Sequence, residues 1–291
     1  MPRKLDVQDL LAFQLPGSVC MSPAGDRIAF VVSRVDKEKN ETQTSIYMVA
    51  PGGKPVRFTG GDSDSAPRFS PDGSQLAFLS RRSGQAQVWV MSLSGGGEAR
   101  QVTRVQGGVG EFDWAPDGTR LAFTAHLKAD GIQPEVKEEK EDDLLKKHTK
   151  DVKTITELTH KLDGVGWYTE RRDCLCLVGL EEGAQPVQLT FPPYSVSEIN
   201  FTPDGRQILF TSRMGEDYDA LAWETNIYSI AVDGGEARQL TPKELTCEGG
   251  SRVSPDGTTV ALIAADPVDM GYGNGRLYLM PLDGGPLTRI A

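Results

Sequence analysis

An all-β fold made of repeated four-stranded antiparallel sheets is predicted by two observations. A turn motif related to Ser-Pro-Asp-Gly, followed by an apolar segment, recurs five times and begins at Ser22, Ser70, Ala115, Thr202 and Ser254. Each copy is followed by a second apolar segment, a Gly-containing turn and a short segment that ends at Thr59, Thr103, Thr190, Thr241 and Ala291. Units of this size with four strands are typical of β-propeller blades.

The strands of each unit follow from its turns. Proline presets the second position of a β-turn and glycine accepts a positive φ, so each Pro-x-Gly motif joins two antiparallel strands, such as 66–69 and 75–79. The second apolar segment and the alternating segment after it form the other two strands. The predicted divisions are a lead segment over 1–16 and a propeller over 17–291, with five recognisable blades at 17–59, 60–103, 104–190, 191–241 and 242–291.

Four turn carboxylates resemble an array but have a structural explanation. An Asp beside Gly stabilises a turn through bonds to its own backbone, and the first copy has Ala24 at this position. We therefore assign a turn role to Asp72, Asp117, Asp204 and Asp256.

The long loops all fall on one face of the predicted propeller. Strand parity places the Pro-x-Gly turns and the Gly-containing turns on one face, and the loops 33–45, 125–172, 213–225 and 265–275 on the other. Such loops either meet a partner domain or substrate, or reflect drift at tolerant sites. The third blade carries an insertion over about 126–166, read as a short exposed helix or a partly mobile arm, which is either a solvated excursion or a docking element.

Composition excludes several classes of protein. The 291 residues contain 41 acidic and 31 basic side chains, a net charge of -10, which argues against a nucleic acid or an anionic membrane as the main partner. No apolar run reaches the ~20 residues that span a bilayer, and the start of the sequence has no apolar signal core. The four cysteines are too sparse for a disulfide scaffold, so we expect buried thiols in a cytoplasmic protein.

Catalytic and metal-binding motifs are missing from the sequence. The segment Gly249–Val253 is the nearest approach to Gly-x-Ser-x-Gly and lacks the final glycine, and the three histidines have no zinc or catalytic spacing. We predict no catalytic residue, no cofactor and no metal. The fourth-blade loop carries acids and aromatic residues that either contact a peptide and restrict substrate access or belong to a solvated loop, namely Glu216, Asp217, Tyr218 and Trp223.

The repeat pattern, with Ile-Tyr in its second segment and Gly-Gly before Leu-Thr, resembles two groups of propellers. One is TolB, and the other is the N-terminal propeller of prolyl oligopeptidase family serine peptidases, especially the acylaminoacyl-peptidase branch. The opening segment 7–11, the segment 19–23 and the return of the insertion through 163–166 look like the peptidase.

This resemblance implies a ring of seven or eight blades that covers an α/β-hydrolase domain, absent from this chain, and admits short peptides. The chain itself is then noncatalytic, its partners are that hydrolase domain and short peptide substrates, and self-association of the full-length protein stays open. The first alternative is a TolB-like platform for protein partners. A weaker alternative is a five-bladed glycan-binding propeller.

Overall fold

The computed structural model describes residues 1–291 except 1–3, 5, 95–96, 134–154, 156, 163–165, 168–170, 216–217, 220–224, 244, 266–274 and 291. Within this part of the chain the strands form five four-stranded sheets, one for each sequence repeat, with the strands of every sheet in chain order. All neighbouring strands in these sheets are antiparallel. This is the predicted all-β propeller architecture.

A short 3-10 helix, η1 (Val7–Ala12), precedes the sheets. The first sheet contains β1 (Leu15–Met21), β2 (Ile28–Asp36), β3 (Glu41–Val49) and β4 (Val56–Arg57). The second contains β5 (Asp64–Phe69), β6 (Gln75–Ser80), β7 (Gln87–Ser92) and β8 (Arg100–Gln101). The third contains β9 (Val109–Trp114), β10 (Arg120–Leu127), β13 (Arg172–Gly179) and β14 (Val187–Gln188).

The fourth sheet contains β15 (Val196–Phe201), β16 (Gln207–Ser212), β17 (Asn226–Ala231) and β18 (Arg238–Gln239). The fifth contains β19 (Thr246–Val253), β20 (Thr259–Ala265), β21 (Arg276–Pro281) and β22 (Thr288–Arg289). A separate two-stranded sheet, β11 (Lys161–Leu162) with β12 (Gly166–Trp167), lies in the insertion of the third repeat. Strand β1 begins at Leu15, inside the predicted lead segment.

The Pro-x-Gly turns have the predicted structure. Their glycines have φ angles of 69° to 72° at the same position of each repeat. Each Asp accepts a hydrogen bond from the backbone N–H two residues later, over 2.9 to 3.1 Å, at Asp72, Asp117, Asp204 and Asp256. In the first repeat, where Ala24 replaces this Asp, the Ser22 hydroxyl donates instead to Asp26 at 2.7 Å. The turn role of these carboxylates is therefore confirmed.

The threonine that ends each of the first four repeats joins its third and fourth strands. Its buried Oγ1 accepts a hydrogen bond of 2.8 to 3.1 Å from a backbone N–H of the third strand, at Thr59, Thr103, Thr190 and Thr241. The fourth strands are only two residues long, so this side-chain bond extends a short ladder. This bond explains why a threonine recurs at the end of these repeats.

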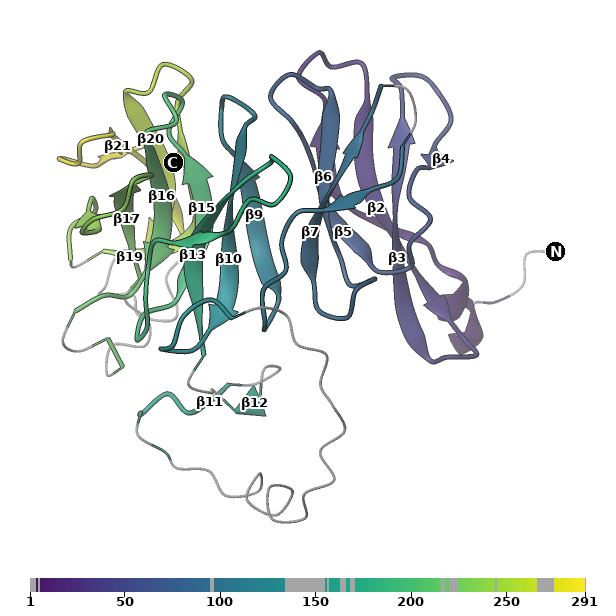
Figure 1. The fold of residues 1–291 in the computed structure, drawn as a ribbon, viewed down its shortest axis with the longest axis horizontal. Helices are drawn as coiled ribbons and strands as arrows, with labels where there is room; N and C mark the ends of the chain where they lie inside the picture. The colour runs from purple at the N-terminus through teal and green to yellow at the C-terminus, as the bar shows by residue number, and fades with distance from the viewer. Residues whose placement is uncertain are drawn as a thin grey trace.

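Hydrophobic cores lie between consecutive sheets, which follow one another from the N-terminal to the C-terminal end in Figure 1. Phe78, Phe123 and Phe210, at one position of the repeat, are completely buried in these interfaces. The sheets at the two ends have one uncovered face. There Phe30 is only partly buried, and Ile263 is 43% exposed although the equivalent Val31 is 5% exposed.

The short sheet of β11 and β12, which belongs to the insertion, lies on one side of the row of sheets (Figure 1). The predicted helical part of the insertion lies outside the described residues, apart from isolated positions such as Ile155. The ring of seven or eight blades stays a prediction. In the described part of the chain, no helix is long and apolar enough to cross a bilayer.

Candidate functional site

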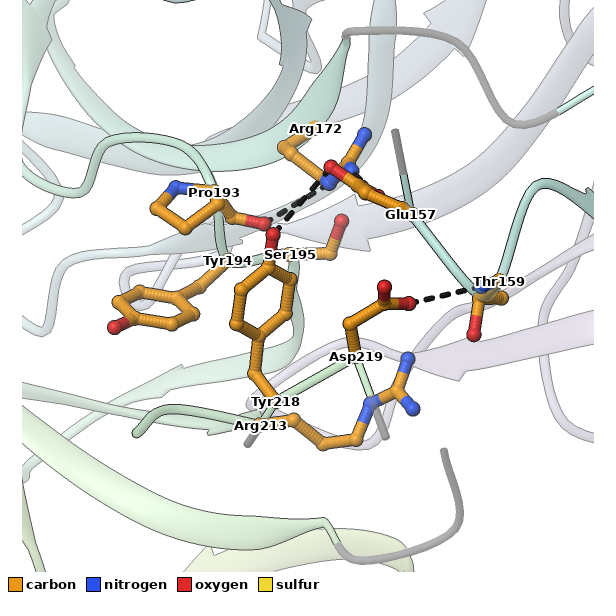
Figure 2. A pocket seen from close by; sticks show the side chains of 9 residues that line it. All are labelled: Glu157, Thr159, Arg172, Pro193, Tyr194, Ser195, Arg213, Tyr218 and Asp219. Carbon is orange, nitrogen blue, oxygen red and sulfur yellow. Dashed lines mark hydrogen bonds and ion pairs between the residues drawn. The ribbon is translucent and has the colours of Figure 1, made fainter. Parts of the chain in front are cut away.

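A small polar pocket lies on the loop-rich face, where the returning insertion meets the loops around the fourth sheet (Figure 2). We call it the loop-face pocket. Its volume is about 30 Å³. It is lined by Glu157, Thr159, Arg172, Pro193, Tyr194, Ser195, Arg213, Tyr218 and Asp219.

Arg172 is the central cation of this pocket. It begins β13, and its side chain is only 4% exposed. Its guanidinium forms an ion pair with Glu157 of the insertion, and its Nε donates to the carbonyl of Pro193 at 2.9 Å. A buried guanidinium needs both charge and hydrogen-bond partners. Arg172 therefore joins the insertion to the link between the third and fourth sheets.

Asp219, in the loop of the fourth sheet, binds the backbone of the insertion. Its carboxylate accepts hydrogen bonds from the backbone N–H groups of Leu158 and Thr159, the latter at 2.8 Å. Burial opposes ionisation of this carboxyl, but these N–H groups and the charge of Arg213 outweigh it, so its pKa lies below the ordinary value of 3.8. Asp219 is therefore an anion that anchors the insertion to the fourth-sheet loop.

Tyr218 is the predicted candidate that the structure places in the pocket. Its hydroxyl donates to Glu157 at 3.4 Å, and its ring packs edge-on against Tyr194 with centroids 5.4 Å apart. Burial and the neighbouring carboxylate of Glu157 raise its pKa. The other three candidates, Glu216, Asp217 and Trp223, lie outside the described residues.

The size of the loop-face pocket limits its chemistry. A volume of 30 Å³ holds one or two waters, since one needs about 10–15 Å³ by this measure. The buried Arg213 NH1 has no hydrogen-bond partner among the described atoms, and a water in the pocket would accept a hydrogen bond from it. The arrangement holds the insertion in place and leaves no room for a peptide. Glu157 and Arg172 were not predicted from the sequence. Their partners in the pocket, Tyr218 for Glu157 and Pro193 for Arg172, are more than 20 residues away in the chain, so no local motif identifies them.

The other residues considered from the sequence have structural surroundings. Cys174, Cys176 and Cys247 are buried free thiols, and Cys20 is partly buried. His126 lies 3.3 Å from the Asp173 carboxylate, and His160 contacts the carbonyl of Leu158. Among the described residues, no group of three or more His, Cys, Asp or Glu side chains is arranged to hold a metal ion.

Comparison with known proteins identifies similar chains. The TolB beta propeller domain family, PD40, matches residues 15–150. An uncharacterized peptidase of Bacillus subtilis, YuxL, is 33% identical over 76% of this chain, which corresponds to 33% of the relative. Dipeptidyl-peptidase 5 of Porphyromonas endodontalis is 28% identical over 85% of this chain and 36% of its own length. The chain thus spans about a third of these curated relatives.

Solved structures show the same fold at low sequence identity. Acylaminoacyl peptidase of Pyrococcus horikoshii superposes with a TM-score of 0.71 at 18% identity, over 99% of this chain and 41% of that protein. A putative TolB from Agrobacterium tumefaciens superposes with a TM-score of 0.61 at 17% identity, over 95% of this chain and 80% of that one. The chain therefore has a β-propeller fold, matches the TolB propeller domain over residues 15–150, and has peptidases among its relatives.

Proposed function

We propose that this chain is the noncatalytic propeller part of a serine peptidase that hydrolyses short peptides. The observation that carries the proposal is its similarity to peptidases over a third of their length, a similarity confined to the propeller described above. In this proposal a separate α/β-hydrolase domain of the same protein supplies the catalytic groups. The propeller restricts which substrates reach them.

The loop-rich face is the part of the propeller that we assign to contact with the hydrolase domain. Arg172, Glu157 and Asp219 hold the returning insertion on this face through an ion pair and hydrogen bonds. A loop that is fixed in this way presents a constant surface, as an interface or an access barrier requires. The four cysteines are free thiols, which supports a reducing compartment such as the cytoplasm.

The first experiment compares this chain with a longer product of the same reading frame that includes a hydrolase domain. Both are incubated with dipeptidyl and acylaminoacyl p-nitroanilides and with a serine-directed fluorophosphonate. We expect the longer product to hydrolyse at least one substrate class and to become labelled, while chain 1–291 does neither. Labelling and turnover by chain 1–291 alone would overturn the noncatalytic assignment.

The gating role needs a second experiment on the longer product. Asp219→Ala removes the acceptor that anchors Leu158 and Thr159, whereas Asp233→Ala changes an exposed carboxylate in a turn of the same sheet. We expect Asp219→Ala to raise the rate on a long peptide relative to a dipeptide substrate, and the control to leave this ratio unchanged. If the ratio of the rate on the long peptide to the rate on the dipeptide substrate is the same in the wild type, Asp219→Ala and Asp233→Ala, gating by the anchored insertion is contradicted.

The second candidate function is a TolB-like platform for protein partners. The match of residues 15–150 to the TolB propeller domain favours it. If no longer product has peptidase activity, and a protein partner binds chain 1–291 in a manner that Asp219→Ala abolishes, the platform replaces the peptidase proposal.

A further inference from the structure

A second, much larger cavity lies between the first strands of four consecutive sheets. It is lined by residues of β5, β9, β15 and β19 and has a volume of about 540 Å³. We call it the axial cavity. Its size falls within the range of small-ligand sites, roughly 300–1,000 Å³, and it shares no residue with the loop-face pocket.

The register of the repeat arranges charges in this cavity in two layers. Four residues before the proline turn motif, the lining residues are Ala66, Glu111, Glu198 and Gly250. Two residues before it, they are Arg68, Asp113, Asn200 and Arg252. We call Glu111 with Glu198 the carboxylate layer, and Arg68 with Arg252 the guanidinium layer.

The direction of the strands orients the two layers. Each first strand runs from the loop-rich face toward its Pro-x-Gly turn, so the carboxylate layer is nearer the loop-rich face and the guanidinium layer nearer the turn face. Pairing with the second strand is irregular at this point in all four sheets. The φ angles of +49° at Ala66 and +56° at Glu198 mark the distortion.

The carboxylate layer is held by the protein backbone and a hydroxyl group. The Glu111 carboxylate accepts a hydrogen bond from the backbone N–H of Glu198, in the neighbouring sheet. The Glu198 carboxylate accepts one from the Thr211 hydroxyl at 3.2 Å. Two acids from adjacent sheets thus face the same cavity, with the small residues Ala66 and Gly250 at the flanking positions of the layer.

The arginines of the guanidinium layer donate hydrogen bonds to backbone carbonyl groups. Arg68 donates to the carbonyl of Pro67 at 3.2 Å, and Arg252 to that of Ser251 at 2.8 Å. Among the described residues, neither guanidinium forms an ion pair within 4.0 Å, and neither does Glu111 or Glu198.

Burial raises the pKa of Asp113, which lies between the two arginines in the repeat order, and the charges of Arg252 and Arg68 act in the opposite direction. Asp113 accepts a hydrogen bond from the backbone N–H of Phe201 at 3.3 Å.

We propose that the axial cavity binds a short peptide with free termini, its ammonium group in the carboxylate layer and its carboxylate in the guanidinium layer. This deepens the proposed function and rests on it, since it names the peptide end groups that the propeller recognises. The Glu198 carboxylate and Arg252 NH1 each lie 3.7 Å from the Cβ position of Gly250, so these two groups are no more than about 7 Å apart. An extended dipeptide, at about 3.5 Å per residue, spans such a distance between its ammonium and carboxylate groups. An extended polyanion is repelled by the carboxylates, and a metal cation by the arginines.

Calorimetric titration of chain 1–291 with L-alanyl-L-alanine tests this assignment. N-acetylation removes the ammonium group of the ligand and amidation removes its carboxylate, so each blocked form is expected to bind at least tenfold more weakly. Glu198→Gln is expected to weaken binding of the free dipeptide about tenfold and to leave the N-acetyl form unchanged. Arg252→Gln is expected to weaken binding of the free dipeptide and to leave the amide unchanged.

Matched controls separate charge recognition from general damage. Glu236→Gln and Arg206→Gln change exposed residues outside the cavity and are expected to leave all affinities unchanged. Equal binding of the free and blocked dipeptides, or no binding of the free dipeptide at millimolar concentration, overturns the proposal.

Filling the cavity gives an independent test. A Cβ atom at Gly250 would lie 3.7 Å from both the Glu198 carboxylate and Arg252 NH1, which is ordinary contact. Gly250→Ala is therefore expected to keep binding, and Gly250→Met to abolish it while circular dichroism shows an intact fold. Unchanged affinity in Gly250→Met would place the peptide elsewhere and refute the assignment.

The binding assay needs no hydrolase domain. If chain 1–291 binds the dipeptide but a longer product has no peptidase activity, only the proposed peptidase function is refuted. If a longer product has peptidase activity but chain 1–291 does not bind the dipeptide, only the assignment of the axial cavity is refuted.

Discussion

Replacing Glu111 with glutamine should stabilise the protein at high pH but not at low pH. Burial raises the pKa of this carboxyl from 4.5 to about 7, and the charges of Glu198 and Asp173 add to the increase. The backbone N–H groups of Glu198 and Ile199 act in the opposite direction. The glutamine oxygen can still accept the N–H of Glu198, so the substitution removes the charge and keeps the acceptor.

The sign and size of the effect follow from proton linkage. Because the folded protein holds this proton more tightly than the unfolded chain, its contribution to stability is present below about pH 4.5 and is lost as the pH rises to about 7. A pKa change from 4.5 to about 7 corresponds to about 3 kcal/mol, at about 1.4 kcal/mol per pH unit. Since Glu111 is only partly buried, we expect a measured difference of about 1–2 kcal/mol.

The assay is urea unfolding of the wild type, Glu111→Gln and the exposed control Glu236→Gln, followed by circular dichroism from pH 4.5 to 8. The free energies of unfolding of wild type and Glu111→Gln should agree near pH 4.5, diverge as the pH rises to about 7 and stay apart up to pH 8, with the variant more stable. In the Glu198→Gln variant, which keeps Glu111, the fall in stability with rising pH should occur at lower pH than in the wild type. This substitution removes a charge that raises the Glu111 pKa. A difference that does not change with pH, or a wild type that is more stable at pH 8, would refute the reasoning.

Three further predictions concern the rest of the structure. Glu157→Ala leaves the Arg172 guanidinium buried without its carboxylate and should cost about 1–3 kcal/mol in urea unfolding, an amount that Glu236→Ala should not approach. Val31→Asp buries a charge between the first two sheets and should cost more than about 3 kcal/mol, whereas Ile263→Asp, on an uncovered face, should cost less than about 1 kcal/mol; equal losses would contradict the interface argument. Iodoacetamide labelling followed by mass spectrometry should modify Cys20 first, and rapid native labelling would contradict the burial of Cys174, Cys176 and Cys247.

The fold was predictable from sequence because its determinants are local and repeated. The turn glycines, the turn carboxylates and the terminal threonines make their bonds within one repeat, so each recurs as a pattern of residues. The all-β class and the four strands of each unit were therefore predicted correctly. The helical part of the insertion and the number of blades in the ring stay predictions.

The candidate site was predictable only in part. Tyr218 attracted attention because aromatic and acidic residues are concentrated in its loop, and it does lie at the loop-face pocket. Its partner Glu157 is 61 residues away in the chain, and Arg172 belongs to a different sheet. Glu111 and Glu198 occupy the same position of the repeat, which the sequence shows. In the sequence, however, each is only one polar residue in a short strand, and nothing indicates that the two lie close together.

The sequence by itself determined the architecture of the unit, because hydrophobic period, turn residues and capping hydroxyl groups act over a few residues. The tertiary structure decided which side chains meet. Only stacking of the sheets brings Glu111 to the backbone of Glu198, 87 residues later, and so creates the charged layers of the axial cavity. Stacking also decides that Val31 is buried while the equivalent Ile263 is exposed, because burial depends on a neighbouring sheet that no single repeat encodes.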